Sequence, residues 1–179
     1  MTVYGDSFSL LQRALHWLMA IMVLAMLFIG VTMVSTLKPR FLTLIAIHKP
    51  LGIAILVLAL LRLGLRLWRG APPLPSDLSS IQVAAAKFSH AVLYALFIAM
   101  PLVGWGMLSA GGYPIVLFGS VHLPRILPQD DQVYAVTAHT FLAYLFFATI
   151  LAHIAAALFH ALIRRDGVFQ AMTWRRVRG

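Results

Sequence analysis

Three histidines share one apolar stretch near the end of the chain: His139, His153 and His160 lie within residues 133–163. A helix rises about 1.5 Å and turns about 100° per residue, so His139 and His153 would lie roughly 21 Å apart on nearly the same face. Seven further residues bring His160 round to that face as well. Imidazole can ligate a metal or carry a proton. The column therefore predicts a cofactor site or a proton path.

The depths of the other histidines can be compared in the same way, because six of the seven fall in apolar stretches. His16 lies near the start of the stretch 14–34, about 27 Å from its far end. His48 lies near the opposite end of the next stretch, so the two are separated along the axis much as His139 and His153 are. An outer level thus contains His48 and His139, an inner level contains His16, His90 and His153, and His160 lies about 10 Å further in.

Paired imidazoles at two depths in a helical bundle are what two bis-histidine haems would need, since each iron takes one nitrogen from either side. Zinc fits less well, because a closed zinc site needs four ligands near one point and the chain has no cysteine. A proton relay is a further alternative, but it does not explain two matched levels. Depth alone does not choose between His16 and His90 as the partner of His153.

The composition predicts the elements that hold these side chains. Hydrophobic residues make up 61% of the 179 residues and charged residues only 11%, against about 25% charged in soluble proteins. Four apolar stretches are each long enough for a membrane-spanning helix, which needs about 17 to 25 residues. These predicted spans are residues 14–34, 42–67, 84–108 and 133–163. We expect one all-α domain over residues 1–179, an integral membrane four-helix bundle of up-down topology.

The distribution of basic residues predicts the orientation of this bundle. Four spans place both termini on one side, and ten of the fourteen Lys and Arg residues fall on that side. By the positive-inside rule, both termini are expected in the cytoplasm. The net charge of +9 is then explained by topology, so we do not expect nucleic-acid binding. The first apolar stretch is longer than the 7 to 15 residues of a signal peptide, so we expect an uncleaved helix.

Prolines and loops add further expectations. Pro50 follows His48 closely and is expected either to open the second helix or to kink it. Pro101 is expected to bend the third helix. Residues 109–132, rich in Gly and Pro, form an outer cap in which His122 is an ordinary loop residue. In the basic tail, Phe169, Met172 and Trp174 are expected to lie on an anionic membrane surface.

The order and spacing of these histidines resemble those of bacterial cytochrome b561 over nearly the whole chain. The residues that carry the resemblance are Leu15-His16-Trp17, His48-Lys49-Pro50-Leu51-Gly52, Ser89-His90 followed by Tyr94, and His139 with His153 and His160. The family implies two b-type haems in a four-helix membrane bundle. In its best-understood bacterial branch, the implied activity is superoxide oxidase, in which periplasmic superoxide is oxidised and ubiquinone is reduced within the membrane.

The resemblance also assigns roles. It gives His48 and His139 to the outer haem iron, and His16 and His153 to the inner haem iron. His90 and His160 then become candidates for the quinone site, with support of the haem propionates as the alternative role. Arg62 and Arg66 share a helix face and could pair with carboxylates of a bound cofactor, although marking topology is the simpler reading.

We therefore expect a two-haem electron conduit in the bacterial inner membrane, with superoxide as donor, ubiquinone as acceptor and lipid around it. No side chain is assigned to acid–base or nucleophilic catalysis. Lys38, Arg40, Lys49 and Arg125 would steer a small anion toward the outer haem. One alternative is a haem-bearing anchor subunit that relays electrons between a separate redox partner and quinone. Another is a haem-free histidine transporter or proton channel.

Overall fold

The computed structural model describes residues 7–36, 39–117, 119–129 and 133–173, and it is almost entirely helical. Its four long helices are α1 (Leu10–Val34), α2 (Arg40–Arg69), α3 (Ser80–Ala110) and α4 (Val133–Leu158). A π-helix, η1 (Phe159–Arg164), continues α4, and a 3-10 turn, η2 (Gln170–Met172), follows. All four helices are long and apolar enough to cross a membrane. The predicted all-α, four-span architecture is confirmed.

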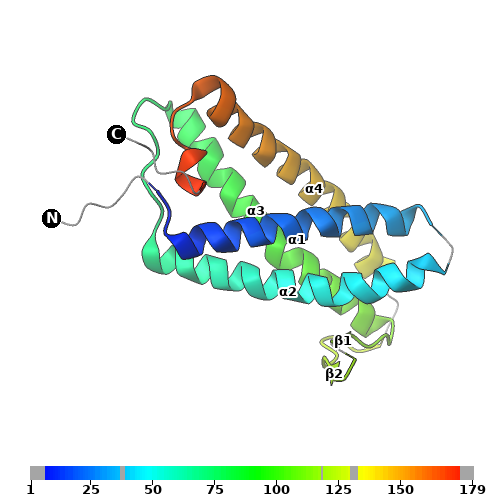
Figure 1. Ribbon diagram of the computed structural model, residues 1–179. Helices are drawn as coiled ribbons and strands as arrows, with labels where there is room; N and C mark the ends of the chain where they lie inside the picture. The colour runs from blue at the N-terminus through cyan, green and yellow to red at the C-terminus, as the bar shows by residue number, and fades with distance from the viewer. Residues whose placement is uncertain (1–6, 37–38, 118, 130–132, 174–179) are drawn as a thin grey trace.

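The helices form two antiparallel pairs that cross at an angle, α1 with α2 and α3 with α4 (Figure 1). The start of α1, the end of α2, the start of α3 and the end of η1 lie together on the left of Figure 1. We refer to this as the basic end, because it holds Arg62, Arg66, Arg69 and Arg164. The opposite end carries two short strands, β1 (Val116–Leu117) and β2 (Val121–His122), and is the hairpin end.

Helices α1 and α3 begin several residues earlier than predicted, and both begin with a capping box. The Ser9 hydroxyl accepts from the Gln12 N–H, while the Gln12 side-chain oxygen accepts from the Ser9 N–H. Ser79 and Gln82 repeat this arrangement at the start of α3. Such boxes satisfy backbone donors that a helix start leaves free. The Ser-x-x-Gln pattern is visible in the sequence and was not used in the prediction.

Pro50 lies well inside α2, so the prediction that it opens this helix is wrong. The helix begins at Arg40, which places His48 in its third turn rather than its first. A proline removes one backbone hydrogen bond, and the long apolar turns on both sides keep the helix continuous. Pro101 likewise lies inside α3.

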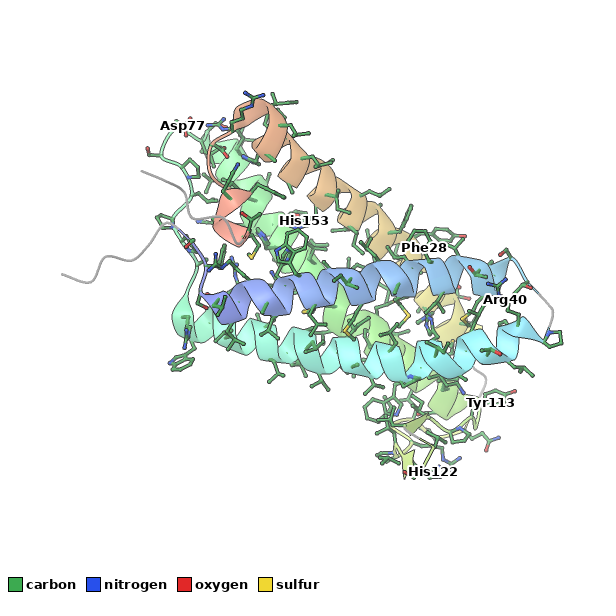
Figure 2. All side chains as sticks on the ribbon, in the orientation of Figure 1. Phe28, Arg40, Asp77, Tyr113, His122 and His153 are labelled. Carbon is green, nitrogen blue, oxygen red and sulfur yellow. The ribbon has the colours of Figure 1, made fainter. Side chains whose placement is uncertain are left out.

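The centre of the bundle is a purely apolar layer to which all four helices contribute. This central apolar layer consists of Met19, Val23, Ile55, Ala59, Leu93, Leu96, Phe97, Phe146 and Ile150. Within it the rings of Phe97 and Phe146 meet edge to face, with centroids 5.0 Å apart. Many other large apolar side chains point outward, such as Phe28, which is 74% exposed (Figure 2). Outward apolar side chains are expected where lipid replaces water.

At the hairpin end, the predicted outer cap folds back onto the end of α3 and the first part of α2. The strands β1 and β2 pair antiparallel, and Trp105 Nε1 donates to Pro124 O at 3.0 Å. Lys49 Nζ donates to Pro114 O at 3.4 Å, which connects α2 to this cap. Figure 2 labels His122 on the cap, where it is exposed. Residues 118 and 130–132 of the predicted cap lie outside the described residues.

At the basic end, residues 171–173 lie against the start of α1, and the expectation that the tail lies on an anionic membrane surface stays a prediction. Phe8 N donates to Ala171 O at 3.1 Å, and Trp17 Nε1 donates to Met172 O at 2.9 Å. The backbone of Ala171 and Met172 is thereby hydrogen-bonded to the start of the bundle. Trp174 lies outside the described residues.

Candidate functional site

At the hairpin end, α2 and α4 bring His48 and His139 together. Their ring centroids are 6.4 Å apart, and the ring planes are inclined by 68°. The Nδ1 atoms of both are buried and have no hydrogen-bond partner among the described residues. A buried polar atom without a partner costs about 1 to 3 kcal/mol, so these rings suit a group that binds them. A Cβ at Gly104 would lie only 3.1 Å from His139 Cε1, so this glycine makes room for the ring.

At the basic end, His153 of α4 lies between two imidazoles. Its ring centroid is 6.3 Å from that of His16 on α1 and 5.8 Å from that of His90 on α3, with planes inclined by 71° and 72°. His90 Nδ1 lies 2.8 Å from Ala86 O and donates to it in the Nδ1–H tautomer, which orients that ring. Figure 2 shows His153 pointing from α4 into the bundle. The structure thus assembles the three histidines predicted for the inner level.

These spacings suit two imidazoles on opposite sides of one metal atom. A histidine nitrogen lies about 2 Å from a first-row metal such as zinc, so ring centres across a metal lie about 6 Å apart. Among the residues that the structure describes, no three His, Asp or Glu side chains are close enough to hold a metal ion unaided. The protein therefore offers imidazole pairs, which match an iron whose other ligands come from a flat macrocycle. The spacing at the basic end admits either His16 or His90 as the partner of His153.

A small pocket next to the three basic-end histidines adds positive charge. It is lined by Phe8, Gln12, Arg62, Arg66, Tyr94 and Met172. The guanidinium carbon of Arg62 lies 5.6 Å from the centre of the Tyr94 ring. Within the described part of the chain, the ion pairs found do not include Arg62 or Arg66. Two such arginines suit the carboxylates of a cofactor.

His160 lies in η1 and is engaged by an aspartate that the sequence analysis did not single out. His160 Nδ1 donates to Asp166 Oδ2 at 2.6 Å, and Arg164 Nε donates to the same oxygen at 2.8 Å. The other guanidinium arm of Arg164 contacts Asp77, labelled at the top left of Figure 2. Burial raises the pKa of Asp166, but its hydrogen bonds from His160, Val168 and Arg164 outweigh this and hold the pKa below its ordinary value.

The residues predicted to steer an anion lie at the hairpin end. Arg40 and Arg125 are exposed there, and Figure 2 shows Arg40 at the start of α2. Lys49 is half-buried and bonded to the cap. Lys38 lies outside the described residues.

Comparison with known proteins agrees with this geometry. A family model described as prokaryotic cytochrome b561 matches residues 7–175. A Yersinia pestis protein named "Probable superoxide oxidase CybB" is 31% identical over 173 residues, which cover 92% of this chain and 94% of that protein. "Cytochrome b561 homolog 2" of Escherichia coli K12 is 30% identical over 174 residues, covering 93% and 91%. "Cytochrome b561 homolog 1" of the same strain is 27% identical over 180 residues, covering 96% and 99%.

The family match extends over all four apolar helices and both imidazole clusters. The matched region covers nearly the whole chain, and the relatives also align over nearly their whole length. These two findings establish the family membership that the histidine pattern had indicated. The chain belongs to the prokaryotic cytochrome b561 family and is a multi-pass bacterial membrane protein that binds haem b and transfers electrons.

Proposed function

We propose that this protein is a superoxide:ubiquinone oxidoreductase that holds two b haems in a single domain over residues 1–179. The observation that carries the proposal is the presence of paired imidazoles at both ends of the bundle, separated by the central apolar layer. The similarity to a relative named as a superoxide oxidase supports the choice of donor. When bound, haem supplies reversible one-electron transfer at its iron.

His48 and His139 hold the outer haem in this proposal. Support comes from their 6.4 Å separation, their unpaired buried nitrogens and the space that Gly104 leaves beside His139. Because the two side chains come from different helices, α2 and α4 must stay in register for the site to exist.

His16 and His153 hold the inner haem. Their separation and inclination, 6.3 Å and 71°, nearly repeat the 6.4 Å and 68° of the outer pair. His90 lies 5.8 Å from His153, and its Nδ1 contact with Ala86 O orients the ring and leaves Nε2 available to a quinone oxygen. We therefore place His90 at the quinone site together with His160. Arg62 and Arg66 bind the carboxylates of the inner haem.

The orientation follows from charge. The positive-inside rule places the basic end in the cytoplasm and the hairpin end in the periplasm, with the protein in the inner membrane. Arg40, Lys49 and Arg125 then give the periplasmic end a positive potential that attracts superoxide. Two superoxide anions yield two electrons and two molecules of oxygen. Ubiquinone takes up those electrons and two protons to form ubiquinol.

The test is to purify the full chain in detergent and supply superoxide together with a soluble ubiquinone analogue. We expect two haems b per polypeptide and quinone reduction without any added protein. Reduction that requires an added redox protein would instead support the anchor-subunit alternative. A protein that binds no haem b when supplied with it would overturn both functions.

A further inference from the structure

The end of α4 departs from regular helical geometry at His160. The last six residues of the span form the π-helix η1, and such turns often occur at functional sites. Arg165 follows with φ 53°, and among the described residues it alone combines a positive φ with a side chain. Holding such a residue in this region typically costs about 1 kcal/mol or more. The reversal at Arg165 brings Asp166 back to His160.

Asp166 is fixed by three donors. Oδ2 accepts from His160 and Arg164, while Oδ1 accepts from the Val168 N–H at 3.2 Å. The Asp166 side chain is 9% exposed and that of His160 is 20% exposed. An ionised carboxylate can only accept, so His160 must carry its proton on Nδ1. The other ring nitrogen, Nε2, is left to exchange protons.

A charged connection leads from this pair to the surface. Arg164 joins Asp166 to Asp77, which lies in the loop between α2 and α3 and is 72% exposed. Among the described residues, Arg164 is the charged group in direct contact with the pair, and Asp77 is reached through it. The network therefore connects the side chain at the end of α4 with the aqueous boundary of the basic end.

We propose that Asp166 is a positioning residue that holds His160 in the Nδ1–H tautomer, so that His160 Nε2 delivers protons to the quinone at the basic end. This inference rests on the proposed function, because it requires quinone reduction at that end. Arg164 holds the carboxylate in place, and Asp77 is only an exposed partner of that arginine.

His160 delivers one proton at a time in this proposal. Protonated His160 gives its Nε2 proton to a quinone oxygen, so that an N–H bond breaks and an O–H bond forms. The ring then becomes neutral and still donates its Nδ1–H to Asp166. A proton from cytoplasmic water restores Nε2–H. Two such cycles supply both protons of the quinol, while two superoxide anions supply the electrons. Asp166 remains ionised throughout.

The test uses the full haem-loaded chain and leaves superoxide out. Protein reduced chemically under anaerobic conditions is mixed with a soluble ubiquinone analogue, and haem reoxidation is followed across pH. We expect Asp166→Asn to slow reoxidation about tenfold or more, as loss of an orienting carboxylate typically does.

Asp77→Asn is the matched control, because it removes a carboxylate from the same arginine without touching His160. It should stay within about twofold of the wild-type rate, as expected for an exposed ion pair. Asp166→Glu restores the charge and should recover most of the rate. Superoxide-driven haem reduction, haem content and thermal unfolding report on the rest of the protein and should match wild type in Asp166→Asn.

The outcomes separate this inference from the function on which it rests. If wild type is reoxidised by the quinone and Asp166→Asn behaves like it at every pH, the inference is wrong and the proposed function stands. If Asp166→Glu, with full haem content, is as slow as Asp166→Asn, the carboxylate charge is not what matters and the inference is again wrong. If the quinone does not reoxidise wild type, both are wrong.

Discussion

The two ends of the bundle hold similarly spaced imidazole pairs in different surroundings. At the hairpin end, His48 faces His139, which lies beside Gly104, and Lys49 next to His48 donates to a backbone carbonyl of the cap. At the basic end, the matching pair is accompanied by a third imidazole, two arginines and the His160–Asp166 pair. Transfer of single electrons needs only the metal ligands, whereas reduction of a quinone also needs protons. In the proposed function, this difference assigns proton uptake to the basic end.

The largest effects are expected from removing one imidazole at each end of the bundle. His139→Ala and His153→Ala should each retain one of the two haems, because each takes a ligand from a different pair. Superoxide-driven quinone reduction should fall about a hundredfold or more in both, since even orienting partners of a ligand are worth 10- to 100-fold. Haem per polypeptide, from absorption spectra, is the measurement. His122→Ala on the exposed cap should keep both haems, and two haems in His139→Ala would contradict the assignment.

The two possible partners of His153 provide the next comparison. His16→Ala should lose the inner haem, whereas His90→Ala should keep both haems and slow only their reoxidation by quinone, by about tenfold or more. Haem content and anaerobic reoxidation, measured on the same samples, distinguish the two. The reverse result, with one haem in His90→Ala and two in His16→Ala, would exchange their roles.

Gly104 permits a smaller perturbation confined to the hairpin end. In Gly104→Ala the added Cβ would lie 3.1 Å from His139 Cε1, so the ring must shift. Overpacking of this kind typically costs about 1 to 3 kcal/mol, and we expect weaker retention of the outer haem only. Gly64→Ala is the control, because a Cβ there meets no atom within 4 Å. Equal haem retention in the two variants would show that Gly104 does not shape the site.

The smallest expected effect concerns acid stability at the basic end. Hydrogen bonds hold the pKa of folded Asp166 below its ordinary value of about 3.8, so the unfolded chain binds more protons in that range. Its contribution to stability is present above about pH 3.8 and is lost as pH falls through the lower folded value. Wild type should therefore lose thermal stability on acidification more steeply than Asp166→Asn. Parallel loss in the two proteins would count against an ionised Asp166.

The sequence predicted the two histidine levels because they depend on little more than helical rise and the apolar spans that lipid requires. It placed the starts of α1 and α3 too late, although Ser9-x-x-Gln12 and Ser79-x-x-Gln82 carry the signal. It took Pro50 as a possible helix start, which the apolar residues before it override.

The partner of His160 could not be predicted from the sequence. A continued regular helix would carry Asp166 past His160. The π-helix η1 and the left-handed conformation of Arg165 reverse the chain direction, so that the Asp166 carboxylate contacts the imidazole. The sequence offered one hint, since Asp166 is an isolated acid in a basic tail. The hydrogen bond from Trp17 Nε1 to Met172 O depends in the same way on a local reversal of the chain rather than on periodicity.

The central apolar layer has a consequence for energy transduction. It consists of apolar side chains, which do not relay protons, and in the proposed function the charge that crosses it moves as electrons. In the proposed function, the hairpin end faces outside and the protons of the quinol are drawn from inside, so each turnover is electrogenic. A membrane voltage that is negative inside then opposes every electron by up to about 2.3 kcal/mol per 100 mV. An energised cell would therefore slow this reaction, and a de-energised cell would accelerate it.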